Sequence, residues 1–394
     1  MHPDTDTDTD VDIDVDIASF RADLVAWLDD HESELRPTHA GHPSLDEEMA
    51  HFRRVKRVVF DAGWGRYGWS TALGGLGGSP MLRAVVNEEV TVRDLVEPGP
   101  WSMIEVLAPT VITFGSVELV ARMIPPLLRG EETWCQGFSE PGAGSDLASL
   151  SCRATPRDGA WVVNGQKVWT SYAQYAERCV LLTRTGPPGS AHRGITAFFV
   201  DMDSPGITVR PIEVLNGANE FCEVFFDDVV VPAARMLGAE GHGWQVAMDL
   251  LPYERSTSFW HRGAFVRHRL DQLVGVVGDR GDHDSRDAAA LGEAFQAIVA
   301  FRCRSRATQY RLASGAPLGP ETSVDKMLIA AAEQVVFDTA RDLLTGLIEF
   351  SASPDADRWR WEYLYSRAAT IYGGTAEVQR NIVARRLLGL GAEP

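Results

Sequence analysis

The apolar residues of this 394-residue chain change their spacing twice, and no other feature constrains the fold as strongly. Across 19–130 they follow a helical period, with Phe20 and Leu24 one turn apart. Across 133–232 the pattern becomes short β-rich runs separated by Gly, Pro and Asp, and after 241 the helical period returns. We therefore expect two helical regions with a β domain of ordinary size between them.

The hydrophobic content of 45% supports a large core and two or three domains. The chain divides into four segments: an acidic tail at 1–17, a helical domain at 18–132, an antiparallel β domain at 133–238 and a helical domain at 239–394. Within the β domain, Asn164-Gly165 in the run WVVNGQKVW predicts a two-residue hairpin turn.

The start of the chain is its most acidic part. Asp occupies every even position from 4 to 16, within a formal net charge of −18. Neighbouring carboxylates on one strand face would repel each other, so we favour disorder over a strand for this tail. The net charge argues against duplex nucleic acid as a partner, because phosphate binding needs clustered Lys and Arg.

Two further classes of protein are excluded by the pattern. No apolar run reaches the about 18 residues of a membrane span, and the first residues do not form a signal-peptide pattern. The five cysteines are scattered, and no Cys or His pair has the spacing of metal ligands. We expect a reduced, cytoplasmic, soluble protein without a metal site.

The first stretch with candidate chemistry is WCQGFSEPGAGSDLASL at 134–150. Gly142 and Gly144 make a tight turn with exposed backbone N–H groups, and Ser139 and Ser145 add hydroxyls. Such a loop suits an anionic or polar ligand, although a generic glycine turn has the same composition. It is not a dinucleotide-binding fingerprint, because GxGxxG is absent.

Two more stretches combine aromatic, hydroxyl and glycine residues. KVWTSYA places the plane of Trp169 beside the hydroxyls of Thr170 and Ser171. This combination suits stacking on a planar ring such as a flavin, or else an ordinary half-buried strand tryptophan. In YSRAATIYGGTAEVQRNIVARRLLGLG one helix ends, two glycines turn the chain, and Thr375 begins the next helix as its cap.

A fourth stretch, GWQVAMDLLPYERSTSFWHRGAFV at 243–266, contains an ionisable pair in an apolar helical pattern. Val246 and Leu250 have helical spacing, and Glu254 and Arg255 follow directly. From these residues alone, the pair is an internal ion pair, a helical turn that faces water, or part of a site.

In this order and at these spacings, the stretches resemble the acyl-CoA dehydrogenase family. The similarity runs from about residue 18 to 391, and its most specific parts are GFSEPGAGSD, GQKVWTS and IYGGTAEVQRNIVARRLLGL. The resemblance implies a mainly α fold with an N-terminal helical domain, a central β-barrel and a C-terminal four-helix bundle. It also implies an FAD cofactor held between the β domain and the bundle.

The resemblance assigns ligand contacts to these stretches. In the family, the glycine-rich loop wraps the flavin, the tryptophan segment covers its ring and hydrogen-bonds N5, and the last helix touches the cofactor. The implied FAD-binding residues are Gln136, Phe138, Ser139, Gly144, Ser145, Trp169, Thr170, Ser171, Thr375 and Glu377. The implied substrate-binding residues are Ser145, Arg255 and Tyr372.

Two features depart from the family pattern. The commonest catalytic base of the family is the Glu of YEGT, where this chain has Gly373. The family's RKTFG-like stretch, which contacts the FAD pyrophosphate of a partner subunit, is missing, and Arg280 and Arg286 are weak substitutes. The backbone N–H of Gly373 can still polarise the thioester carbonyl, as in an oxyanion hole.

Glu254 is the expected base. A minority of the family, typified by the isovaleryl and long-chain enzymes, carries the base on the first helix of the bundle. There it precedes an Arg, and Gly or Ala stands at the usual base position. LPYER matches that place, so the displaced carboxylate and the vacated position occur together in this chain. We expect Glu254 to remove the Cα proton of an acyl thioester.

The expected reaction is α,β-dehydrogenation of an acyl-CoA to the trans-2-enoyl thioester, with hydride transfer to flavin N5. An electron-transfer flavoprotein is the expected oxidant. A homodimer, homotetramer or heterotetramer is expected, because FAD often bridges subunits in this family. Two alternatives stay open: a flavin oxidase or monooxygenase on the same fold, and a non-catalytic subunit of a hetero-oligomeric dehydrogenase.

Overall fold

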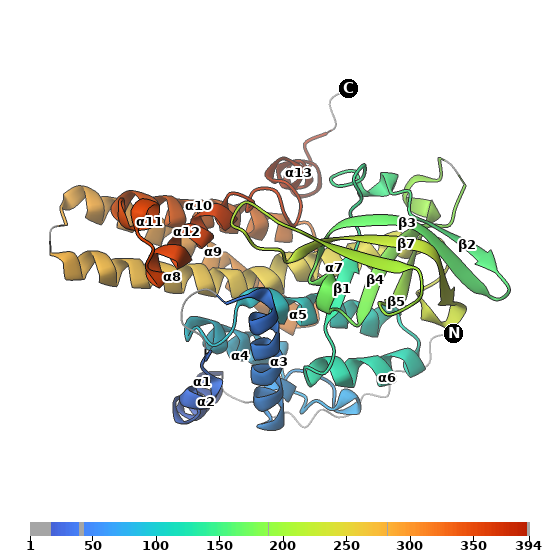
Figure 1. Ribbon diagram of the computed structural model, residues 1–394, viewed down its shortest axis with the longest axis horizontal. Coiled ribbons are helices and arrows are strands. Elements are labelled where there is room, and N and C mark those ends of the chain that lie inside the picture. The colour runs from blue at the N-terminus through green and yellow to red at the C-terminus, as the bar shows by residue number, and fades with distance from the viewer. Residues whose placement is uncertain (1–16, 39–42, 188, 282, 392–394) are drawn as a thin grey trace.

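The computed structural model describes residues 17–38, 43–187, 189–281 and 283–391 (Figure 1). The acidic tail predicted at 1–17 therefore lies outside the described residues, apart from Ile17 at the start of α1. Helices build both ends of the described chain, and one sheet lies between them in sequence (Figure 1). The predicted order of helical, β and helical regions is thus confirmed.

The described N-terminal region contains the helices α1 (Ile17–Asp30), α2 (Glu32–Leu35), α3 (Leu45–Asp61), α4 (Pro80–Val92), α5 (Pro98–Phe114) and α6 (Val117–Leu128). Local signals set where two of them begin. Ser44 and Glu47 exchange hydrogen bonds in a capping box ahead of α3. Ser79 caps α4 directly before Pro80, which occupies the first helical position. The apolar faces pack into a core whose fully buried members include Leu24, Val55, Leu107 and Ile124.

The middle region is a single sheet of strands β1 (Trp134–Gly137), β2 (Arg153–Arg157), β3 (Ala160–Ser171), β4 (Arg178–Arg184), β5 (Ile195–Asp201), β6 (Ile207–Ile212), β7 (Phe221–Pro232) and β8 (Met236–Leu237). The strand order is β6-β7-β3-β2-β4-β5-β8, and β1 pairs with β4. The β1–β4 and β2–β4 pairs are parallel and the others antiparallel, so the sheet is mixed and not wholly antiparallel as predicted. Within the described residues β6 and β8 end the path unpaired with each other, so the predicted barrel is not confirmed.

The predicted hairpin turn at Asn164-Gly165 is wrong. β3 continues through both residues, and the turn between β2 and β3 is Asp158-Gly159, with φ of +51° and +79°. Gly165 instead lies at a bulge against Cys152, where a Cβ atom would approach the Cys152 Cα to 2.7 Å. The glycine is therefore required by close packing rather than by a turn.

The C-terminal region contains α7 (Gly243–Tyr253), a π-helical turn (Glu254–Ser258), α8 (Phe259–Arg280), α9 (Ser285–Ala313), α10 (Thr322–Leu343), α11 (Leu347–Phe350), α12 (Pro354–Ser366), α13 (Ala376–Ile382) and a second π-helical turn (Val383–Leu387). Helices α8, α9 and α10 pack together, and α12 packs against α10, in a bundle that extends away from the sheet (Figure 1). Within the residues described, no helix combines the length and apolarity that a bilayer crossing requires.

The three regions meet around the start of α8. Helix α4 packs against α8, and α5 packs against α7, the π-helical turn Glu254–Ser258 and strand β1 of the sheet. This junction brings residues of all three regions within reach of one another, and the candidate site lies there.

Candidate active site

Glu254 and Gly373 are adjacent in the fold. Glu254 is half-buried and begins the π-helical turn between α7 and α8, shortly after Pro252. Single π-helical turns are rare and occur frequently at functional sites. A Cβ atom on Gly373 would lie 3.1 Å from Glu254 Oε1 and 3.1 Å from Phe259 Cζ. The carboxylate of Glu254 therefore lies where a side chain of residue 373 would begin.

The turn that carries Gly373 requires both of its glycines. Gly373 and Gly374 have φ of +63° and +92°, which disfavour any residue with a side chain. A Cβ atom on Gly374 would also approach Gln379 Nε2 to 2.3 Å. Thr375 caps α13 by accepting a hydrogen bond from the Val378 N–H, as the sequence predicts. Within the described residues the Gly373 N–H has no hydrogen-bond acceptor, so it remains available to a ligand.

Arg255 lies beside the same turn. Its Nη2 atom would be 3.7 Å from a Cβ on Gly374, and its Nε is buried without a hydrogen-bond partner among the described residues. Burial lowers the pKa of Arg255, the nearby Glu254 raises it, and Arg386 lowers it further. A guanidinium with an unused donor thus lies within electrostatic reach of the Glu254 carboxylate.

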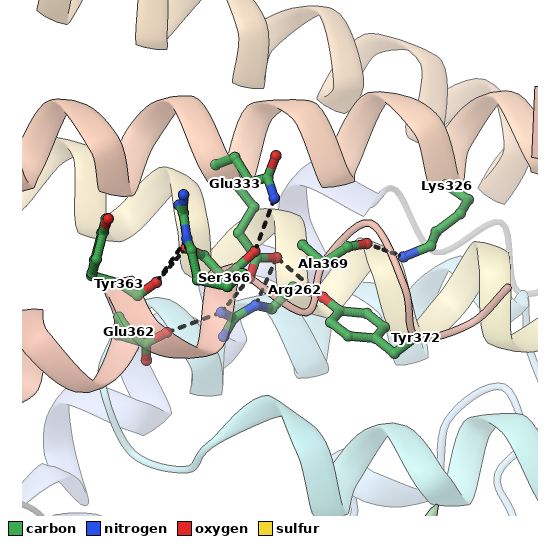
Figure 2. Close-up of polar contacts among 10 residues, drawn as sticks. Arg262, Lys326, Glu333, Glu362, Tyr363, Ser366, Ala369 and Tyr372 are labelled. Carbon is green, nitrogen blue, oxygen red and sulfur yellow. Dashed lines mark hydrogen bonds and ion pairs between the residues drawn. The ribbon is translucent and has the colours of Figure 1, made fainter. Parts of the chain in front are cut away.

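A buried ionic network holds Tyr372 in place (Figure 2). Arg262 donates to Glu333 at 2.8 and 3.1 Å and to Glu362 at 2.9 Å, and the Tyr372 hydroxyl donates to Glu333 at 3.2 Å. Lys326 donates to the Ala369 carbonyl at 2.5 Å, with its ammonium 4.1 Å from the centre of the Tyr372 ring. Tyr372 and the chain just before it are therefore anchored to α10, and through Glu333 to Arg262 on α8.

The sequence motifs did not predict this network, although the small number of lysines could have indicated buried positions. The chain has lysine only at 56, 167 and 326, and each of these side chains is at most 1% exposed. In a chain with abundant Arg, the few Lys residues therefore mark interior positions. Burial lowers the pKa of Lys326 to about 8, while the carboxylates of Glu333 and Glu254 act in the opposite direction.

We call the segments 136–145 and 168–171 together the tryptophan surface. The Val168 N–H donates to the Ser139 carbonyl at 2.9 Å, so the loop and the strand lie side by side. Trp169 has φ of +60° and a side chain that is 56% exposed, which is unusual for a large strand tryptophan. The Thr170 hydroxyl is buried and has no hydrogen-bond partner within the described residues.

The glycine-rich loop of the tryptophan surface is fixed at its start and open at its turn. The Glu140 carboxylate accepts hydrogen bonds from Lys167 at 2.7 Å and from the N–H groups of Ser151 and Cys152 at 2.7 and 2.9 Å. A Cβ atom on Gly144 would have no neighbour within 4 Å. The predicted cofactor residues divide accordingly into buried Phe138 and Thr170, half-buried Gln136, Ser139 and Ser171, and exposed Gly144, Ser145 and Trp169.

The remaining predicted positions, Glu377, Arg280 and Arg286, are all exposed. Glu377 is exposed and pairs with Arg380 at 3.7 Å on α13. Arg280 ends α8, a 22-residue helix of about 33 Å, and Arg286 is almost fully exposed beyond it. The structure therefore does not bring either arginine to Glu254 within one chain.

Two cavities that sequence analysis did not anticipate lie at the junction of the three regions. The inner cavity, of about 110 Å³, is lined by the aromatic residues Phe259 and Tyr372, among others. Its lining also contains three acidic residues, Glu48, Glu97 and Glu220. The outer cavity, of about 490 Å³, shares Glu48, Glu220 and Trp361 with it.

Comparison with known families covers nearly the whole described chain. Models of the acyl-CoA dehydrogenase N-terminal, middle and C-terminal domains match residues 31–131, 135–229 and 241–388. The chain belongs to the acyl-CoA dehydrogenase family. This is a family of oxidoreductases, and the resemblance stated from the sequence is confirmed.

Individual acyl-CoA dehydrogenases agree with this assignment. The chain is 36% identical over 388 residues to acyl-CoA dehydrogenase IpdE1 of Mycobacterium tuberculosis, covering 96% of this chain and 98% of the relative. It is 36% identical over 322 residues to FadE34 of the same organism, covering 80% and 43%. Among solved structures, the Tcur3481-Tcur3483 steroid ACAD has a TM-score of 0.83 at 25% identity, covering 96% and 98%.

Proposed function

We propose that this protein is an FAD-dependent acyl-CoA dehydrogenase that forms a trans-2-enoyl thioester, with Glu254 as the base. One observation carries the proposal: the Glu254 carboxylate lies 3.1 Å from the point where a side chain of residue 373 would begin. A base on the π-helical turn ahead of α8 would then act from nearly the same place as a base at position 373.

The FAD assignment is supported by the unused groups of the tryptophan surface. A planar ring over the exposed Trp169 would cover an apolar face, and an acceptor at its edge would satisfy the orphan hydroxyl of Thr170. The open turn at Gly144 leaves room for the rest of the cofactor. The residues present therefore fit FAD, which when bound supplies the hydride acceptor.

The other chemical roles fall to residues around the 373 turn. As the Cα–H bond breaks, its proton passes to the Glu254 carboxylate, and the electron pair left at Cα forms the new double bond as a hydride leaves Cβ. The free N–H of Gly373 would donate to the thioester carbonyl and lower the pKa of the Cα–H bond. Arg255, with its unpaired Nε, would bind the polar thioester arm together with Ser145.

We also propose that the protein works as an oligomer and passes electrons to an electron-transfer flavoprotein. Large apolar side chains are exposed near the C-terminal end, where Ile371 is 63%, Leu388 65% and Leu390 58% exposed. Arg280 and Arg286, far from Glu254 in their own chain, could reach only a cofactor of a neighbouring subunit. The steroid ACAD cited above is named for two proteins, which favours testing a heteromer and a ring-bearing acyl group here.

Anaerobic mixing with a panel of acyl-CoA thioesters tests the function. We expect a yellow protein whose flavin absorbance near 450 nm bleaches with at least one saturated thioester, while the enoyl product accumulates in equal amount. A protein that binds FAD but is not bleached by straight, branched or ring-bearing thioesters would be the non-catalytic subunit. Rapid reoxidation of the bleached enzyme by oxygen would instead identify the oxidase alternative.

A further inference from the structure

The inner cavity has two chemically different ends. Phe259 and Tyr372 line the end beside Gly373, and therefore beside the Glu254 carboxylate. Glu48 and Glu220 belong to the other end, because they also line the outer cavity. An acyl group bound with its Cα at Glu254 would thus extend its tail toward these two carboxyl groups.

The far end holds carboxyl groups that make no hydrogen bond or ion pair with the part of the chain that the structure describes. Glu220 is only 7% exposed, and within the described residues its carboxyl makes no hydrogen bond or ion pair. Its backbone is fixed, because the Glu220 carbonyl accepts a hydrogen bond from the Tyr172 N–H at 2.7 Å. Glu48 on α3 and Glu97 ahead of α5 line the same space from the helical side. The Glu220 carboxyl oxygens are not fully enclosed by protein atoms, so they face cavity space in which a polar group of a ligand can become their partner.

The charges around Glu220 do not neutralise it. Arg262 is the cation among the residues that line the inner cavity, and it is already paired with Glu333 and Glu362. Burial raises the pKa of Glu220 to about 7; Arg262 lowers it, and Glu362 and Glu97 raise it. Burial also raises the pKa of Glu48 well above its usual range. A protonated carboxyl both donates and accepts hydrogen bonds.

We propose that the far end of the inner cavity recognises a neutral hydroxyl or keto oxygen on the tail of the acyl group, with Glu220 as the residue that determines this specificity. The proposal rests on the dehydrogenase function proposed above, because that function places an acyl group in the cavity. A plain hydrocarbon tail would leave Glu220 unpaired, and a carboxylate tail would meet three like-charged or acidic groups. An ammonium tail would require ionised carboxylates at this end, whereas burial raises the pKa of Glu220 and Glu48 and so favours their protonated form.

Binding of matched ligands to the FAD-loaded protein tests this without relying on turnover. The probes are the 2-enoyl thioester of 3-cyclohexylpropanoyl-CoA and its ring derivatives bearing a hydroxyl, keto, carboxylate or ammonium group at carbon 4. We expect calorimetry to show roughly tenfold tighter binding of the hydroxyl and keto ligands than of the unsubstituted one. Equal affinity for the unsubstituted ligand, or tightest binding of either charged ligand, overturns the proposal.

Variants assign the preference to one residue. Glu220→Leu should remove the tenfold preference, Glu220→Gln should retain most of it, and Glu213→Leu, at an exposed position of the same domain, should leave it unchanged. Should Glu220→Leu fail to fold, Glu220→Ala takes its place with the same expected loss, and an unchanged preference in that variant overturns the assignment. A protein that prefers the oxygenated ligands but never bleaches with their saturated forms contradicts the proposed function alone. Bleaching without any preference contradicts this inference alone.

Discussion

The tryptophan surface and the inner cavity adjoin one another through Ser171 and Tyr172, but they are built in different ways. The tryptophan surface comes from two continuous stretches, and its free groups are an exposed ring, an open glycine and an orphan hydroxyl. The inner cavity is assembled from single residues of several elements and contains buried charges. The tryptophan surface therefore comes almost entirely from two local segments, and its free groups are available to a ligand. The inner cavity exists only because tertiary packing brings distant residues together.

The largest expected effect tests whether the cavity wall depends on its buried ions. Arg262→Met leaves Glu333 and Glu362 buried without their cation, and we expect a loss of roughly 3–5 kcal/mol in unfolding free energy. Arg267→Met, on the same helix, removes a partly exposed pair with Asp271 and a cation–π contact with Phe295, and should lose at most about 1–2 kcal/mol. Urea unfolding followed by fluorescence measures both. Equal losses would mean that the network does not support the wall.

Glu254→Gln tests the boundary between the two regions. The variant keeps shape and most hydrogen bonding but removes the proton acceptor, so flavin reduction by a substrate should slow by roughly a hundredfold or more. FAD content and unfolding free energy should stay near the original values, because Glu254 has no ion-pair partner within 4 Å among the described residues. Stopped-flow absorbance gives the rate. An unchanged rate rules out Glu254 as the base. A less stable variant whose residual activity follows its folded fraction indicates a structural role.

The pH dependence of stability should separate the two regions further. The pKa of Glu220 is about 7 in the folded protein, above its unfolded value, so the folded state binds more protons between roughly pH 4.5 and 7. The stabilising contribution of Glu220 to the unfolding free energy is therefore fully present below that window. It is lost as the pH rises through the window and the buried carboxyl ionises. We compare the unfolding free energy of Glu220→Gln with that of the original protein. This difference should shift in favour of the variant by about 2 kcal/mol between pH 5 and pH 8.

The same charged and ionisable groups face Glu220 in both proteins, so the comparison must be a difference between them. They are Glu48 on α3, Glu97 ahead of α5, Arg262 on α8 and Glu362 on α12, whose pKa burial also raises to about 7. Denaturant unfolding at several pH values measures the difference. Parallel pH profiles for the two proteins would show that Glu220 does not titrate in this window.

The smallest effect is expected at the tryptophan surface. Thr170→Val removes only the orphan hydroxyl and should weaken FAD binding by about tenfold or less, since one hydrogen bond contributes about 1 kcal/mol. Without FAD, the variant should be as stable as the original, because no internal hydrogen bond is lost. Thr208→Val, exposed on β6, is the matched control. Fluorescence titration of the FAD-free proteins with FAD measures the three affinities. Equal affinities for the original protein, Thr170→Val and Thr208→Val would contradict a contact between Thr170 and FAD.

Local residues were sufficient for much of this molecule. The change from helical to alternating spacing determined the order of helical, β and helical regions, because each period buries one face of one kind of element. The cap at Thr375 and the loop of Gly142 and Gly144 were readable for the same local reason. The pairing of Gly373 with a carboxylate elsewhere was predicted from the family pattern, and the roles of Glu254 and the cofactor residues stay predictions.

Other features were decided only by tertiary packing. Asn164-Gly165 has the composition of a hairpin turn, but Cys152 packs against Gly165 in the sheet and the neighbouring Asp158-Gly159 makes the turn. Closure of a sheet depends on long-range register, which no short pattern encodes, and β6 and β8 remain unpaired with each other in the described chain. The inner cavity and its network join residues from Glu48 to Tyr372, and burial rather than residue type makes Glu220 and Lys326 unusual. Sequence determines which residues can ionise, whereas the fold decides which of them lose water and which partners they find.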